Sequence, residues 1–197
     1  MAHGSAGTVR RGTLWTSVAV TAVAAGTAGA WAATAAQPDQ PPFSVTRVEA
    51  SHVFDLANLD QLTAAGDHVF VGRVGPQVSA VRLGVAPETQ FQVDVVRRIK
   101  GQLPASVLVN QQGGYDGFSN RLVLMENDEM LETGRSYLFV TRVNPQYGWH
   151  TLVPGTGKVR LDPRQGAAGE ARVLSYQRAV ERTRGRTLGE VMSGRVN

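Results

Sequence analysis

The side chains that most often carry chemistry are sparse in this sequence. The chain contains no cysteine, so it has neither a thiol nucleophile nor a thiolate metal ligand, and it cannot form a disulfide. After the first few residues its histidines are His52, His68 and His150. None of the three has another suitable ligand four residues away, the spacing that puts two ligands on one face of a helix. We therefore predict no metal site and no cofactor.

The motifs of nucleophilic catalysis are missing as well. The sequence has no Gly-x-Ser-x-Gly turn and no Ser-x-x-Lys pair, which are patterns that place a hydroxyl beside its activating base. Residues 126–129 and Glu132 form an acidic run, but the run lacks the order of a calcium-binding loop. We interpret it as a solvated turn, and we predict no catalytic residues and no enzyme activity.

Two segments have the composition of recognition surfaces. Residues 110–120 combine amide side chains and two aromatic residues with three glycines, which suits either a ligand-binding loop or a flexible turn. Residues 144–150 predict a hairpin turn whose two aromatic residues form either a recognition patch or a cross-strand pair. The candidate partner-binding residues in these two segments are Gln111, Gln112, Tyr115, Phe118, Tyr147 and Trp149.

The N-terminal segment has the layout of a membrane-targeting sequence. Arg10 and Arg11 precede residues 12–38, which carry no charge. Small-residue triplets such as Ala33-Thr34-Ala35 follow the apolar part and suit cleavage by a signal peptidase. The uncharged run is also longer than the ~20 residues that a bilayer requires. Residues 1–36 are therefore predicted to be either a signal peptide or a single membrane anchor, with the membrane reached through residues 12–36.

The remaining residues divide into a mildly acidic body and a basic tail. Residues 37–157 hold 9 basic and 12 acidic residues, whereas residues 158–197 hold 9 basic and 4 acidic ones. Such a tail could contact anionic lipid or cell-wall polymer. Its only aromatic residue is Tyr176, whereas single-stranded nucleic acids are bound by sets of stacking aromatic rings. We predict no nucleic-acid partner. The preference for Arg over Lys is typical of a GC-rich bacterial coding sequence.

The hydrophobic pattern favours short strands. Residues 89–95 alternate apolar and polar side chains. Arg97 continues the apolar phase of this pattern, so the strand must bulge or end near Val96. Residues 68–74 predict a strand that Gly75-Pro76 stops. Further strands are predicted at 106–110, 122–125, 137–143, 149–153 and 159–162, with helices near 58–65 and over 170–181.

These elements predict a mainly β fold. Short strands separated by Gly, Pro and Asn turns indicate a small barrel of five to six strands, preceded by a short helix and followed by a C-terminal helix. The predicted organisation is a signal peptide or anchor over 1–36, a Pro-rich linker over 37–50, the barrel over 51–165 and a basic helix or tail over 166–197.

The order of motifs resembles a known family. Asp67 precedes the strand at 68–74, the strand that begins near Phe91 ends in Ile99-Lys100-Gly101, and Leu131-x-x-Gly134-x-x-Tyr137 leads into a later strand. This order resembles the OB-fold module shared by tissue inhibitors of metalloproteinases and the netrin C-terminal region. The resemblance covers residues 67–143 and implies a five-stranded OB-like barrel. Those inhibitors act through an N-terminal cysteine that chelates zinc, and the absence of cysteine here means that their mechanism does not carry over.

The sequence therefore predicts an exported, non-enzymatic binding module with a protein or cell-envelope partner. It would be extracytoplasmic, either secreted or held by one N-terminal transmembrane segment. Two alternatives remain open: a secreted protease inhibitor that acts through a loop, and an envelope spacer that holds its basic tail against an anionic polymer.

Overall fold

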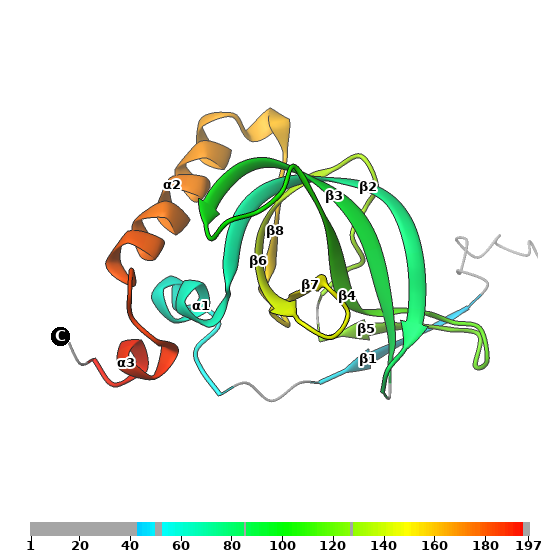
Figure 1. The fold of residues 1–197 in the computed structure, drawn as a ribbon. Helices are drawn as coiled ribbons and strands as arrows, with labels where there is room; N and C mark the ends of the chain where they lie inside the picture. The colour runs from blue at the N-terminus through cyan, green and yellow to red at the C-terminus, as the bar shows by residue number, and fades with distance from the viewer. Residues whose placement is uncertain (1–42, 50–52, 85, 127, 195–197) are drawn as a thin grey trace, which may run out of the picture. The chain divides into compact units, whose positions relative to one another are not determined.

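The two longest strands of the protein pair with each other. The computed structural model describes residues 43–49, 53–84, 86–126 and 128–194, in which β2 (His68–Arg82) and β3 (Pro87–Lys100) form an antiparallel hairpin (Figure 1). Both strands are rich in β-branched residues, which favour extended backbone. The other elements are β1 (Ser44–Val48), α1 (Leu59–Ala65), β4 (Ser106–Asp116), β5 (Arg121–Met125), β6 (Ser136–Asn144), β7 (Trp149–Leu152), β8 (Lys158–Leu161), the 3-10 helix η1 (Pro163–Gln165), α2 (Ala167–Arg182) and α3 (Leu188–Met192).

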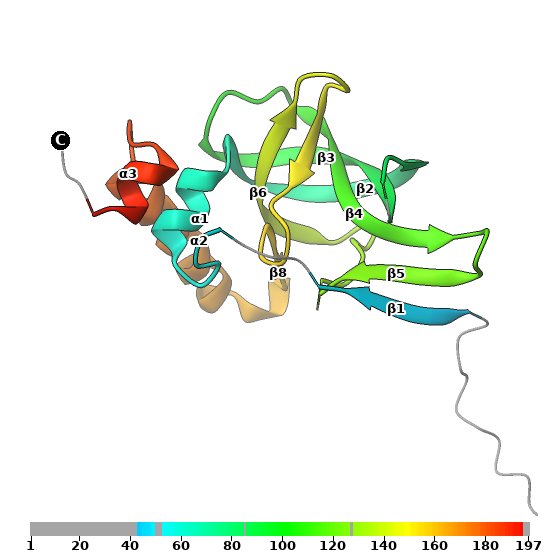
Figure 2. The same ribbon diagram turned by 90° about the horizontal axis from the view of Figure 1, so that it is seen from below.

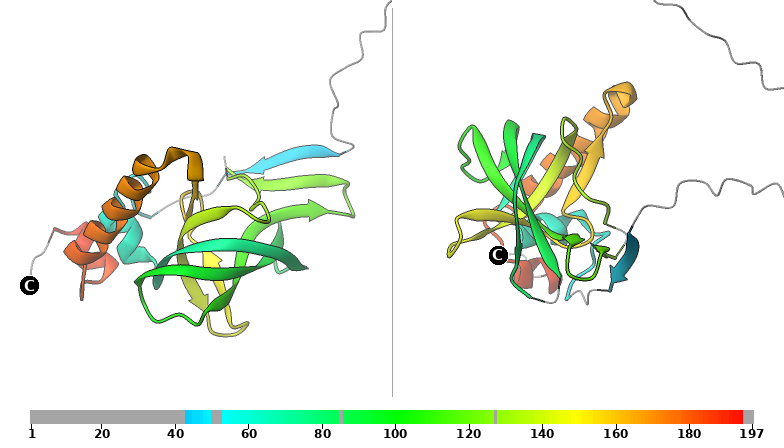
Figure 3. Two further views of the ribbon diagram at one scale, coloured as in Figure 1. Left: turned by 90° about the horizontal axis from the view of Figure 1, so that it is seen from above. Right: turned by 90° about the vertical axis from the view of Figure 1, so that its right-hand side faces the viewer.

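Five strands close into a ring. Strands β4, β3, β2, β6 and β7 pair antiparallel in that order. The ring closes because β7 also pairs in parallel with β4, where Val109 lies opposite His150 and Asn110 opposite Thr151. Strands β5 and β1 extend the sheet beyond β4, and β8 lies beside the first half of β6 (Figures 2 and 3). The fold is therefore mainly β, as predicted, and its sheet has eight strands.

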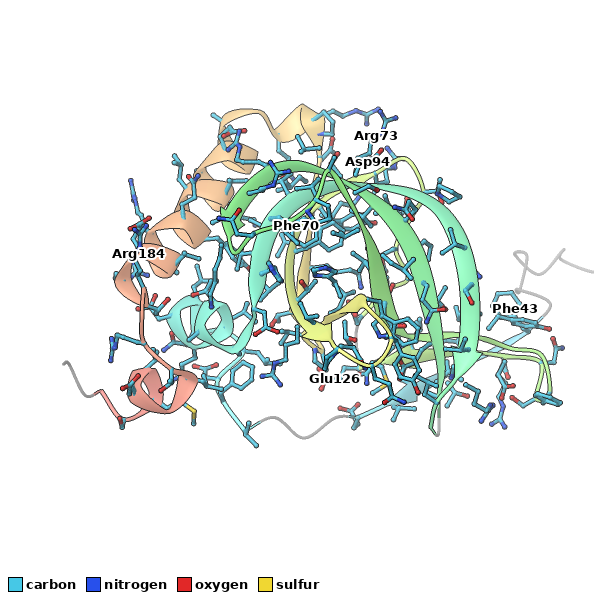
Figure 4. All side chains as sticks on the ribbon, in the orientation of Figure 1. Phe43, Phe70, Arg73, Asp94, Glu126 and Arg184 are labelled. Carbon is cyan, nitrogen blue, oxygen red and sulfur yellow. The ribbon has the colours of Figure 1, made fainter. Side chains whose placement is uncertain are left out.

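Alternation along the strands builds two apolar cores. Phe70 of β2 points into the ring, as Figure 4 shows, and its side chain stacks on Phe139 with ring centroids 5.0 Å apart. Its neighbours Val69 and Val71 belong to the second core, together with Tyr176 of α2. Successive side chains of a strand point to opposite faces. One strand therefore contributes both to the interior of the ring and to the layer under the helices.

Two cations fasten helix α1 to the sheet. The Lys100 ammonium donates hydrogen bonds to the carbonyl oxygens of Thr63 and Gly66, over 2.7 and 2.6 Å. The Arg142 guanidinium donates to the carbonyl oxygen of Ala65 over 2.8 Å. The last carbonyls of a helix lack intrahelical partners and carry partial negative charge. Strands β3 and β6 thus supply the positive groups that this helix end requires.

The predicted bulge in the second long strand is confirmed, whereas the predicted end of the first is wrong. Val71 pairs with Arg97 and Gly72 with Val95, so that Val96 is the extra residue of a register shift. Strand β2 runs on through Gly75-Pro76 to Arg82. A proline lacks the N–H that a ladder needs, but it is tolerated at an edge or a bulge. Both conditions hold here, because β6 pairs with β2 only as far as Arg73 and the β2–β3 register shifts again after Val74.

The structure describes most of the predicted C-terminal tail but not the predicted N-terminal membrane segment. The predicted signal peptide or anchor lies outside the described residues, as do His52 and half of the predicted linker, whose other half contains β1. Among the described residues, no helix is long and apolar enough to cross a membrane. The predicted C-terminal helix is α2, and its residues Val173, Tyr176 and Val180 pack in the second core. This part of the basic tail is thus integrated with the sheet.

Candidate functional site

The first predicted recognition segment is a hairpin and not a loop. Residues 110–116 continue strand β4, and only residues 117–120 form the turn to β5. Gly113 and Gly114 pair with Leu124 and Val123 of β5. The glycines that predicted a flexible loop therefore lie within a ladder, with φ angles of 109° and 144° that favour glycine.

Gln111 is a structural residue of the ring and does not lie on the surface. Its side chain is fully buried. Its amide nitrogen donates to the Glu129 carbonyl over 2.8 Å, and its amide oxygen accepts from the Leu131 backbone over 2.9 Å. The sequence predicts a partner-binding role for Gln111, but both polar atoms of its buried amide are already satisfied inside the protein, so this structure does not present them to a partner. Gln112 is half-buried and lines a separate small cavity of about 160 Å³ near Glu88.

The turn that follows is held by one carboxylate. Asp116 accepts hydrogen bonds from the Ser119 hydroxyl and the Arg82 guanidinium, both over 2.6 Å, and from the Phe118 backbone over 3.2 Å. The bonds from Ser119 and Arg82 lower the pKa of Asp116. Arg82 belongs to β2, so this contact also joins the end of the β2–β3 hairpin to the β4–β5 turn. Phe118 is therefore presented by a turn with a defined conformation.

The two aromatic residues of this hairpin are exposed, as predicted. Phe118 is 99% exposed and Tyr115 is 54% exposed. The Tyr115 hydroxyl donates to the Asn120 side chain over 2.7 Å, and Phe43 meets the Tyr115 ring edge-on at 5.8 Å. Figure 4 places Phe43 at the end of the molecule where β1 begins. We call Phe43, Tyr115 and Phe118 the aromatic tip.

A groove lies beside the aromatic tip, with a volume of about 410 Å³. Strands β2, β3, β4 and β5 and the segment before β6 contribute its lining residues, and none of them has a carboxylate, imidazole, ammonium or guanidinium group. Uncharged concave surfaces with a few polar groups are typical of ligand-binding sites. The lining residues are Gln77, Ala80, Thr89, Phe91, Gly114, Tyr115, Leu122, Met130, Leu131 and Thr133.

The wall of the groove depends on a close approach between β3 and β4. The Thr89 hydroxyl donates to the Gly113 carbonyl over 2.8 Å. A Cβ atom on Gly114 would lie 2.3 Å from this hydroxyl oxygen, well inside van der Waals contact. A side chain at position 114 would therefore displace Thr89. On the other side, the Thr133 hydroxyl donates to the Gly75 carbonyl over 3.0 Å and holds the segment before β6 against β2.

The second predicted segment is separate from the groove. Tyr147 and Trp149 stack on each other with ring centroids 4.5 Å apart, and Trp149 is only 7% exposed. No residue of the 144–150 segment lines the groove. The structure thus favours the packing role for Trp149. Its buried ring is not presented at the surface of this structure.

A buried ion pair occupies part of the acidic run. The Lys158 ammonium and the Asp128 carboxylate contact each other, with 7% and 12% of their side chains exposed. Burial lowers the pKa of Lys158 and raises the pKa of Asp128. Both residues line a polar cavity of about 240 Å³, in which Arg160 also pairs with Glu132 over 2.6 Å. The prediction of a solvated turn is therefore wrong at Asp128. The pair fastens the segment before β6 to β8.

Two histidines meet at the far end of the ring. The rings of His68 and His150 lie edge to face with centroids 4.9 Å apart. The His68 Nε2 atom lies 3.1 Å from the Gln102 carbonyl, and His150 Nδ1 lies 3.4 Å from the Thr141 hydroxyl. Burial, together with the nearby His68, lowers the pKa of His150. Among the described residues, no group of three His, Cys, Asp or Glu side chains could hold a metal ion.

Two comparisons with known proteins found no match. No model of a known protein family matches the chain, and no curated protein matches its sequence. A functional interpretation must therefore rest on the chemistry of the residues themselves.

Sequence reasoning missed most of the groove. It found Tyr115, but it ended the first long strand at Gly75-Pro76 and so omitted Gln77 and Ala80. The burial of Gln111 could have been predicted from the sequence. Val107, Val109 and Gln111 alternate along the strand and therefore lie on one face, which indicates that Gln111 points inward with the two valines.

Proposed function

We propose that the protein is an exported, non-enzymatic binding module that takes an extended, uncharged segment of a partner protein into its groove. The observation that carries this proposal is the groove itself, about 410 Å³ lined by neutral side chains from four strands and the segment before β6. This lining supports binding, because it lacks the imidazole, carboxylate and ammonium groups that most often act as general acids and bases.

The polar groups of the groove fit a peptide. Gln77 is exposed and carries an amide that can both donate and accept hydrogen bonds. Leu122 and Met130 supply apolar contact beside it. Extended peptides are commonly recognised by pairing backbone polar groups and by seating alternate side chains in apolar hollows. A charged polymer would find no counter-charge among the lining residues.

The fold is consistent with the OB-like barrel that the resemblance implies. Five strands form the ring, and OB-folds are five-stranded barrels that use one face and the adjoining loops to bind ligands. In this interpretation β1 and β5 are additions to the barrel, and they form part of the side on which the groove lies. The location is proposed from sequence: residues 12–38 carry no charge and follow Arg10 and Arg11.

A peptide-display experiment tests the proposal. Random peptides selected on the full-length protein should be uncharged and rich in apolar residues. Ala80 is exposed and lines the groove, so Ala80→Arg should weaken the affinity for selected peptides by about tenfold or more, about 1.4 kcal/mol. Leu174 on α2 is 45% exposed and lies outside the groove, so Leu174→Arg is the matched control and should bind with unchanged affinity.

Two results would refute the groove as a binding site. One is a set of selected peptides whose affinity is the same for Ala80→Arg and for the wild type. The other is a preference for anionic cell-wall polymer over every peptide, which would favour the spacer alternative and its basic tail. Inhibition of a panel of secreted proteases at micromolar concentration, unaffected by Ala80→Arg, would instead favour a loop-based inhibitor.

A further inference from the structure

The aromatic tip has the features of a surface that meets lipid. Phe118 stands at the end of the β4–β5 turn with its side chain almost completely exposed, and the Asp116 hydrogen bonds fix the turn that carries it. Tyr115 and Phe43 lie against each other beside it. Aromatic residues are enriched where a protein crosses or touches the interface between water and hydrocarbon.

The charges around the tip favour a lipid headgroup surface. Arg82 and Arg121 flank the turn, and both are exposed. Asp116, the acidic residue of the turn, already accepts hydrogen bonds from Arg82 and Ser119. Leu83 follows Arg82 and is also exposed. Because Arg82 and Asp116 neutralise each other, Arg121 leaves the turn with a net positive charge. Apolar side chains beside a net positive charge fit a surface whose headgroups are anionic and whose interior is apolar.

The path of the chain adds a second and independent argument. Phe43 is the first described residue, and it belongs to the aromatic tip. Only residues 37–42 separate it from residues 12–36, the predicted membrane segment. The seven residue steps from position 36 to Phe43 span at most about 25 Å when fully extended. A membrane that held residues 12–36 would therefore lie within that distance of Phe43.

We propose that residues 12–36 remain in the membrane as an anchor and that the aromatic tip contacts the headgroup region of the same bilayer. This inference rests on the export part of the proposed function. Tyr115 belongs both to the tip and to the lining of the groove, so the groove would open close to the membrane surface. The partner segment would then be one that lies at or near that surface.

Site-directed spin labelling tests the contact directly, because a chain without cysteine accepts a single label at any chosen position. The full-length protein would carry a nitroxide at Phe118→Cys and be reconstituted into vesicles of phosphatidylethanolamine and phosphatidylglycerol. Phe118 is fully exposed, so the label should not disturb the fold. Leu174→Cys on α2 is the matched control, since α2 and the β4–β5 turn lie at opposite ends of the described domain (Figure 2).

The expected result is a large difference between the two labels. The nitroxide at position 118 should collide more with oxygen, which concentrates in lipid, and less with a water-soluble nickel complex than the nitroxide at position 174. Equal accessibility at the two positions would overturn the contact. A chain that fails to float with the vesicles, or that is recovered from cells with its N-terminus near residues 33–37, would overturn the anchor. Peptide binding by the same labelled proteins reports separately on the groove.

Discussion

The two ends of the β2–β3 hairpin are built in opposite ways. From Val69 to Arg73, β2 is paired on both edges and contributes to both cores. From Pro76 to Arg82 the same strand has β3 on one side only, and six of its seven residues are exposed. One end of the hairpin therefore stabilises the fold, whereas the other is available for contacts with other molecules. The candidate site borders this second end, because Gln77 and Ala80 of β2 line the groove and neither belongs to a core.

Two phenylalanines give the sharpest test of this comparison. Phe139 is fully buried inside the ring, and Phe118 is fully exposed at the tip. We expect Phe139→Ala to lower the free energy of unfolding by about 3–5 kcal/mol, through lost burial and the cavity that remains. Phe118→Ala should change it by less than about 0.5 kcal/mol. Denaturant unfolding followed by circular dichroism measures both, and a comparable loss for the two variants would contradict the division between the ends.

The buried ion pair should give the next largest effect. Lys158→Met leaves the Asp128 carboxylate buried without its cation, and removal of one member of such a pair costs about 3 kcal/mol. The double variant Asp128→Asn with Lys158→Met removes both charges and should recover most of this loss. Equal stability of the single variant and the wild type would show that the pair does not hold the segment before β6 in place.

A smaller effect is expected from pH at the helix-covered end. The pKa of His150 is lowered in the folded protein, so the unfolded chain binds this proton more readily. The contribution of His150 is therefore fully present above the unfolded pKa of about 6.5 and is lost as the pH falls through that value toward the folded pKa. Thermal unfolding from about pH 7.5 to about pH 5 should show a shallower decline for His150→Gln than for the wild type. Parallel profiles would exclude His150 as a source of acid sensitivity.

The sequence predicted the presence of the strands and helices better than the residues at which they end. The bulge at Val96 could be predicted because Arg97 falls at a position where the alternation of the strand calls for an apolar side chain. This alternation can be read from neighbouring residues alone. The extension of β2 past Gly75-Pro76 could not be predicted in the same way. Whether a proline ends a strand depends on whether its missing N–H faces a partner, and only the pairing of β2 with β6 decides this.

The candidate site was predicted only in part, for a related reason. Exposure of Tyr115 and Phe118 follows from a Gly-rich turn. The groove, by contrast, combines Ala80 with Met130, residues that are neighbours only because of the sheet order. The role of Trp149 could not be predicted from the sequence, because an aromatic side chain beside a turn suits recognition and cross-strand packing equally well. Its burial in the folded protein favours packing.

The closure of the ring between β4 and β7 has a consequence for how the protein opens. This join consists of two residue pairs, Val109 with His150 and Asn110 with Thr151, whereas β2 and β3 pair over eleven positions. A short ladder of paired residues separates at a lower free-energy cost than a long one. Local opening of a protein therefore begins at its weakest boundaries. We expect the backbone amides at this seam to exchange with deuterium earlier than those of the central hairpin, so that solvent reaches the interior by this route before the whole domain unfolds.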